Sequence, residues 1–174
     1  QGSSLLVAEP PYTQEAQLAA LGAPLYLAWA PLSRKLLLHV EESHFLVATD
    51  GSGVSVTLVG DSGSYRTPAW APDERYVAYM GPQDEEESIL LVSADGARTR
   101  LFNARGEVQV FLWSPRGDLM AVAYSSDESA VPFFEGLRLL RTDRATLHGP
   151  IYVDEVIAFF WSPDGTKLAV ASFD

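Results

Sequence analysis

A chain of 174 residues is long enough to bury the core of one domain, and 47% hydrophobic against 20% charged residues is typical of a folded soluble protein. No apolar run reaches the roughly 18 residues that a membrane helix needs, so we expect no membrane span. The net charge of −11 argues against a nucleic-acid partner, which calls for clustered Lys and Arg, and the absence of cysteine excludes disulfides and thiolate metal sites.

The first two predicted strands lie before the first tryptophan. Residues 4–8 form an apolar run that aligns with residues 44–48 further along the chain. Residues 14–22 have helix-forming composition, with Thr13 as a candidate N-cap and Gly22 as a candidate C-cap. We nevertheless predict a strand over residues 16–21, because the repeat described next needs one there and tertiary context commonly overrides helix propensity.

A tryptophan-proline unit recurs four times along the rest of the chain. All four tryptophans occupy the same position in it, a proline follows two residues later, and successive tryptophans lie 41, 43 and 48 residues apart. A period in the low to middle forties is typical of one four-stranded β-propeller blade. The repeat rests on Trp29, Trp70, Trp113 and Trp161, with Pro31, Pro72, Pro115 and Pro163.

Each part of the unit has a physical role in a blade. Tryptophan ends a β-rich run, and its ring is large enough to fill the gap between neighbouring blades. Proline cannot donate to a strand ladder, so it ends the strand, and Asp164-Gly165 is typical of the tight turn that follows. The apolar runs after each turn predict strands buried on both faces, at residues 36–40, 76–80, 119–124 and 168–171.

The order of these runs predicts an all-β fold, a β-propeller of four-stranded antiparallel blades with strands a, b, c and d. We expect blades over residues 24–60, 65–103 and 107–148, and a split blade made of residues 153–174 and 4–22. The chain then reads c-d, three full blades, a-b, which adds up to four blade equivalents. The ring closes within a four-bladed chain, by a dimer that exchanges half-blades, or in a longer parent propeller, and the last two are favoured.

The unit resembles the repeat of TolB-type β-propellers, in which a Trp-Ser-Pro-Asp-Gly segment precedes an apolar strand. Residues 161–169 match best, whereas Arg116 replaces the Asp of the third unit, Glu74 replaces the Gly of the second, and the first unit has lost both. The Gly-His and Trp-Asp signatures of WD repeats are absent. The resemblance covers essentially the whole chain. It implies the fold and, because such propellers are typically extracytoplasmic in bacteria, a periplasmic or secreted location.

The sequence contains none of the spacings that mark a catalytic or metal site. It has no Gly-x-Ser-x-Gly nucleophile elbow, no phosphate-binding glycine loop, no His-Glu-x-x-His and no calcium-binding loop. His39, His44 and His148 lack ligand spacing, so we interpret them as structural or surface histidines. We therefore expect no catalytic residue, metal or cofactor in this chain, and no enzyme activity of its own.

Acidic clusters at residues 41–42, 84–87, 127–128 and 154–155 fall in b–c or d–a connections, which emerge on one face of a propeller. They are either ordinary solvated loops or a negative rim that recruits a basic partner or a cation. The longest b–c connection, 125–136, holds two aromatic residues that either fold back over a blade or anchor a protein partner. The candidate partner-binding residues on this face are Tyr65, Arg66, Arg105, Phe133, Phe134, Asp154 and Glu155.

These features favour a non-catalytic protein-interaction or scaffolding propeller, which binds a protein or peptide through its b–c and d–a loops. The alternative, implied by the resemblance, is the propeller portion of an enzyme, either a prolyl-oligopeptidase-like peptidase or a polysaccharide lyase. A third hypothesis is a unit whose only task is assembly, such as a homodimer formed by half-blade exchange.

Overall fold

The fold is described by a computed structural model that covers residues 3–173 apart from residues 9, 13–14, 23–24, 33, 50–52, 62–67, 84–85, 97–98, 103–106, 126–133 and 145. This part of the chain is all-β, as the sequence predicted. Within these residues there is no helix that is long and apolar enough to cross a membrane.

The N-terminal strands form a two-stranded antiparallel sheet, β1 (Ser3–Val7) with β2 (Gln17–Gly22). The strand predicted near residues 16–21 is therefore confirmed against the helical composition of that segment. Ala19 and Ala20 of β2 pack on the buried apolar cluster of the next sheet. Burial of this apolar surface outweighs the small difference in intrinsic helix propensity.

The alignment of residues 4–8 with residues 44–48 is wrong by one residue. The register of the β1–β2 pair shifts after Leu5, whereas the corresponding shift in the next sheet comes after His44. Leu5 and His44 also point the same way, because each packs on the sheet that follows its own. Leu5 is thus the equivalent of His44, and Leu6 that of Phe45. A β-bulge shifts the register of two paired strands, but the pattern of apolar residues in the sequence does not reveal it.

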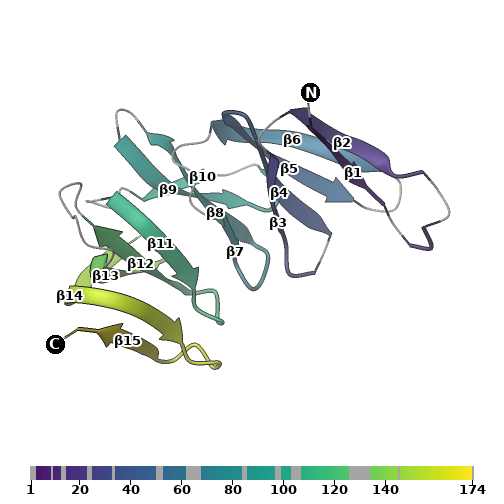
Figure 1. Cartoon of the computed structure of the whole chain (residues 1–174). Helices are drawn as coiled ribbons and strands as arrows, with labels where there is room; N and C mark the ends of the chain where they lie inside the picture. Colours follow the sequence, from purple (N-terminus) through teal and green to yellow (C-terminus); the bar gives the residue numbers. More distant parts are fainter. Residues whose placement is uncertain are drawn as a thin grey trace.

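Two four-stranded blades follow in the predicted order of strands (Figure 1). Each strand pairs antiparallel with the next, and the b strands β4 and β8 are buried almost throughout, which explains their unbroken apolar sequences. The first blade is β3 (Leu25–Trp29), β4 (Lys35–Val40), β5 (Ser43–Thr49) and β6 (Val54–Asp61). The second is β7 (Ala69–Trp70), β8 (Tyr76–Gln83), β9 (Glu86–Ser93) and β10 (Thr99–Phe102).

The last sheet has five strands, because one long strand serves two units of the repeat. Its order is β11 (Glu107–Trp113), β12 (Leu119–Ser125), β13 (Phe134–Arg141), β14 (Thr146–Trp161) and β15 (Leu168–Ser172). The first half of β14 pairs with β13 as a d strand, and the second half pairs with β15 as an a strand. The interval expected between residues 148 and 153 therefore lies inside a continuous strand.

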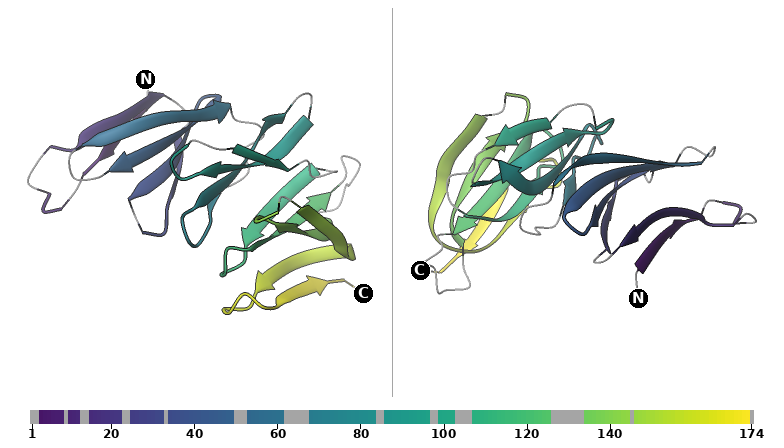
Figure 2. Two further views of the ribbon diagram at one scale, coloured as in Figure 1. Left: turned by 180° about the vertical axis from the view of Figure 1, so that it is seen from behind. Right: turned by 90° about the horizontal axis from the view of Figure 1, so that it is seen from above.

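The sheets follow one another along an open arc, and the chain ends lie at its two extremes (Figures 1 and 2). Among the described strands β1 pairs only with β2, and β15 pairs only with β14. The C-terminal a-b pair therefore does not meet the N-terminal c-d pair of the same chain. Closure into a four-bladed ring within one chain is not what the structure shows.

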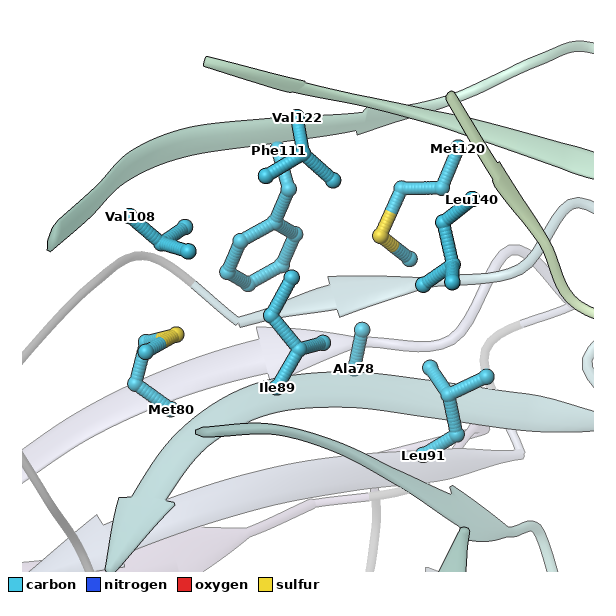
Figure 3. Close-up of a cluster of buried hydrophobic side chains, with 9 residues drawn as sticks. All are labelled: Ala78, Met80, Ile89, Leu91, Val108, Phe111, Met120, Val122 and Leu140. Carbon is cyan, nitrogen blue, oxygen red and sulfur yellow. The ribbon is translucent and has the colours of Figure 1, made fainter. Parts of the chain in front are cut away.

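The core lies between the blades. Figure 3 shows one such layer, in which side chains of β8 and β9 face those of the last sheet. Ile89 and Met80 point toward Phe111 and Val108, and all nine labelled side chains are almost fully excluded from water. Burial on this scale is the main stabilising term for stacked sheets, at roughly 1.5–3 kcal/mol for each large apolar side chain.

Three of the four tryptophans make the same contact with the preceding blade. Each indole Nε1 donates a hydrogen bond to the backbone oxygen of the residue just before the preceding tryptophan. The bonds run from Trp70 to Ala28 at 2.8 Å, from Trp113 to Ala69 at 2.9 Å and from Trp161 to Leu112 at 3.1 Å. The repeat thus connects neighbouring blades through one indole that both fills space and satisfies its own N–H group.

Three of the a–b turns contain a residue with positive φ two positions after the proline, namely Glu74, Gly117 and Gly165. Gly117 has φ of 73°, and its N–H donates to Ser114 O at 2.9 Å. A Cβ added at Gly117 would meet no atom closer than 3.5 Å, so the cost of a side chain there is conformational. We expect Gly117→Ala to lower the free energy of unfolding by about 1–2 kcal/mol in urea titrations, with the exposed Arg116→Ala nearly neutral. Equal losses for the two variants would contradict this origin of the cost.

Candidate functional site

Each blade has two ends. The a–b and c–d turns lie at one end, which we call the turn face, and the b–c and d–a connections lie at the other, which we call the rim face. In the first blade, Glu41 and Glu42 join β4 to β5 on the rim face, where Ser43 pairs with Asp61 at the end of β6. The rim face is the one on which the sequence predicted partner-binding residues.

Carboxylates on the turn face are engaged by neighbouring side chains. Asp164 accepts hydrogen bonds from the hydroxyls of Ser162 and Thr166 and from the Thr166 N–H, and these bonds lower its pKa to about 2. Other turn-face carboxylates form exposed ion pairs, which are Asp73 with Arg75, Asp118 with Arg116, and Asp143 with Arg141 and Arg144. Such pairs add little stability, but they leave the turn face locally balanced in charge.

Three carboxylates on the rim face are not engaged in this way. Glu41, Glu42 and Glu155 are exposed, and within the described part of the chain their carboxylates form no ion pair or hydrogen bond. A cavity of about 300 Å³ opens beside Glu41, between β2 and the first blade, and is lined mainly by apolar side chains such as Leu21 and Phe45. The rim face therefore combines unpaired negative charge with an apolar recess.

The structure brings two of the predicted partner-binding residues together. Phe134 is the first residue of β13 and pairs with Val156, so it lies beside the exposed Glu155. Its half-buried ring meets the ring of Phe159 edge-on at 6.3 Å between centroids. Asp154 lies in β14, next to Glu155, and its side chain is outside the described atoms. Tyr65, Arg66, Arg105 and Phe133 lie outside the described residues.

A column of aromatic rings, which the sequence did not predict, lies near the rim face. Tyr26, His39 and His44 belong to β3, β4 and β5, and Tyr79 belongs to β8 of the next blade. Successive ring centroids are 5.9, 4.8 and 4.2 Å apart. His39 and His44 are buried, as a structural histidine would be, whereas His148 is exposed on β14. The only signal in the sequence is the facing pair His39 and His44 at a hairpin.

Two members of the column, His44 and Tyr79, are uncharged at neutral pH. Burial, with a smaller contribution from the neighbouring His39, lowers the pKa of His44 to about 4, although a backbone hydrogen bond at Asp61 acts in the opposite direction. Burial also raises the pKa of Tyr79 to about 12. His44 Nδ1 and the Tyr79 hydroxyl have no hydrogen-bond partner among the described atoms. Such groups suit a bound water or a neutral ligand better than a charged one.

Groupings of His, Asp and Glu that could hold a metal ion do not occur within the described residues. The two buried histidines stack face to face, so their ring planes do not converge on one point as metal ligands do.

No protein-family model and no curated protein matches the chain in sequence. Solved structures do match in shape. A protein assigned as TolB from Agrobacterium tumefaciens has a TM-score of 0.62 at 16% identity over 91% of this chain, and TolB from Acinetobacter baumannii has 0.59 at 14% over 96%. An oligogalacturonate lyase in complex with manganese has 0.62 at 14% over 91%.

The chain spans 62%, 42% and 48% of the lengths of these three proteins, in the same order. Identities of this size show the fold and nothing finer. The likeness agrees with the tryptophan-proline units, the four-stranded blades and the inter-blade indole hydrogen bonds. The described chain has the fold of a TolB-type β-propeller, of which it forms an open arc of blades.

Proposed function

We propose that this chain is a non-catalytic interaction module whose rim face binds a basic protein or peptide. The observation that carries the proposal is the contrast between its two faces. Turn-face carboxylates such as Asp73, Asp143 and Asp164 are paired with arginines or hydroxyls. On the rim face, Glu41, Glu42 and Glu155 are exposed and have no partner among the described residues. Unpaired surface charge of one sign attracts a partner of the other sign and speeds its association.

The recess beside Glu41 supports the same proposal. A cavity of about 300 Å³ is large enough for one apolar side chain, and carboxylates at its edge would hold a neighbouring Lys or Arg. A partner segment that alternates basic and apolar residues fits this arrangement. The proposal also includes the other candidate partner-binding residues as contacts with the partner on the same face, namely Tyr65, Arg66, Arg105, Phe133, Phe134 and Asp154.

Two further features belong to the proposal. The location is extracytoplasmic, in the bacterial cell envelope, and its support is the likeness of the fold to TolB. The second feature is a homodimer formed by half-blade exchange.

The second candidate function is the propeller portion of an enzyme. The likeness to the manganese-bound oligogalacturonate lyase favours it at the level of the fold. Metal analysis of the purified chain separates the two candidates, because a chain that acts as this manganese-bound lyase does should retain manganese. A metal-free chain that binds basic peptides supports the interaction module.

The decisive test compares two isosteric triple variants of equal net charge. Glu41→Gln/Glu42→Gln/Glu155→Gln removes three negative charges from the rim face, and Asp73→Asn/Asp118→Asn/Asp143→Asn removes three from the turn face. The probes are peptides displayed from a random library and selected on the wild-type chain. We expect selected peptides to be rich in Lys and Arg, and to bind the rim variant at least about tenfold more weakly while the turn variant binds normally.

Binding should also weaken as salt rises from about 0.05 to about 0.5 M, because exposed charges are screened. Circular dichroism of both variants checks that they fold. Selected peptides without basic residues, or equal loss of binding in the two variants, would contradict the proposal.

A further inference from the structure

The contact between the first and second blades departs from the repeat. At each blade junction, the residue nine positions after a tryptophan faces a c-strand residue of the preceding sheet. The equivalent c-strand residues His44, Ile89 and Leu137 each pair with the residue ten positions after their tryptophan. Three junctions place an aliphatic pair in one apolar cluster, namely Leu5 and Leu38, Ile89 and Val122, and Leu137 and Val170. The remaining junction, between the first and second blades, has a histidine against a tyrosine instead.

This exception brings polar atoms into a buried junction. His44 Nδ1, the Tyr79 hydroxyl and Ser88 Oγ have no hydrogen-bond partner among the described atoms. The three residues are only 3%, 0% and 1% exposed. Buried polar atoms are nearly always bonded to protein or to ordered water, because an unpaired one is costly. The other junctions show that an aliphatic pair fits this position, so these polar atoms point to a bound molecule.

Two of the polar atoms lie where β6 ends, and their bonding types are complementary. The backbone oxygen of Asp61 accepts a hydrogen bond from the His44 ring, and this bond comes from Nε2, since Nδ1 has no partner. The neutral ring therefore carries its proton on Nε2 and offers Nδ1 as an acceptor. The Tyr79 hydroxyl keeps its proton at neutral pH and is a donor. A Cβ built at Gly60, next to Asp61, would lie 3.1 Å from this hydroxyl.

Ser88 belongs to the same corner of the junction. It pairs with Gly81, where an added Cβ would lie 3.3 Å from the backbone oxygen of Asp61, so β6 and β8 come close together there. Ser88 also shares a face of the second blade with Tyr79, because it is two residues from Leu90, the strand partner of Tyr79. A corner walled by strand backbone and two stacked rings suits a molecule the size of water.

We propose that an ordered water molecule occupies this corner and joins the first two blades. The water accepts a hydrogen bond from the Tyr79 hydroxyl and donates its two protons to His44 Nδ1 and Ser88 Oγ. Three hydrogen bonds are the usual number for a buried water. The two blades are then joined at the turn face by the indole of Trp70 and at the rim face by the water.

The stacking of the two rings makes a single water sufficient. The ring centroids of His44 and Tyr79 are 4.2 Å apart and the planes are inclined by 37°. His44 belongs to the first blade and Tyr79 to the second, so the water is a bond between blades and not within one. It is part of the fold and needs no partner. The inference therefore holds or fails independently of the proposed function.

A crystal structure at a resolution that shows ordered solvent tests the site directly. We expect a water within about 3.2 Å of both His44 Nδ1 and the Tyr79 hydroxyl. A side chain of the protein in that position, or a direct hydrogen bond between the two groups, would overturn the proposal.

Tyr79→Phe tests the site in solution, because it removes the hydroxyl and keeps the ring. With the water in place, the variant loses the donor that the water needs, and its unfolding equilibrium constant in urea titrations should rise at least about tenfold. The exposed Tyr12→Phe is the control and should change this constant by less than about threefold. If the hydroxyl of Tyr79 bonds nothing, Tyr79→Phe will unfold no more readily than the wild type, and the proposal is wrong.

A double-mutant cycle with His44→Phe tests whether the two groups share one water. Both substitutions keep the stacked rings, and the bond from His44 to Asp61 is lost equally in the single and double variants, so it cancels. We expect the double variant to unfold at least about fivefold less readily than the product of the two single effects predicts. Single effects that simply multiply would show that no molecule links the two residues.

Circular dichroism of each variant checks that it folds.

Discussion

Replacing Trp70 with alanine is expected to lower the free energy of unfolding by about 3–5 kcal/mol. Trp70 is almost fully buried between the first two blades, where it belongs to the same apolar cluster as Ala30 and Val77, and its indole donates to Ala28 O at 2.8 Å. Alanine would leave a cavity between two sheets that cannot close on it, and would remove the donor of a buried hydrogen bond.

The matched control is the same substitution at Trp29, which sits at the equivalent position of the first blade and is 46% exposed. Trp29→Ala should cost less than about 1 kcal/mol, because an exposed side chain loses little on truncation. Urea titrations measure both variants. A similar loss for the two variants would mean that inter-blade packing is not what the tryptophans contribute.

Acidification is expected to destabilise the protein through His44, by about 3 kcal/mol between neutral pH and pH 4. The pKa of His44 is about 4 in the folded chain against 6.5 for a free histidine. The unfolded chain therefore binds a proton at His44 before the folded chain does. Stability from this group is fully present above pH 6.5, is lost as the pH falls toward 4, and changes no further below that.

His44→Phe should remove this part of the pH dependence, because phenylalanine keeps an aromatic ring between His39 and Tyr79 but does not titrate. The exposed His148→Phe serves as the control and should retain it. Urea midpoints across the range report the difference between variants, in which the common titration of carboxylates cancels. Parallel pH profiles for wild type and His44→Phe would show that another group is responsible.

The tryptophan-proline units could be recognised from the sequence because their roles are local. A proline ends a strand, a residue with positive φ makes the turn, and the next apolar run must be buried, whatever surrounds it. The positions of β4, β8, β12 and β15 and the all-β class follow from those rules. The strand at Gln17–Gly22 also followed, although only the repeat and not the local composition pointed to it.

Features that depend on contacts between distant segments could not be predicted from the sequence. The register of β1 was misjudged by one residue, because the bulge after Leu5 depends on its pairing with β2. The aromatic column escaped because Tyr79 comes from a different blade than His39 and His44. The contrast between the two faces escaped as well, since the sequence shows where carboxylates lie but not which of them meet an arginine.

The sequence by itself determined the repeat, its period and the type of strand at each end, because these rest on turn chemistry and on apolar patterns within one unit. Only the tertiary structure decided that the arc stays open within one chain, that Trp29 and Phe160 are exposed, and which carboxylates remain unpaired. Those properties depend on how the sheets stack in space. The sequence pattern shows which side chains a blade presents on its surface, but it does not show which other segments cover them.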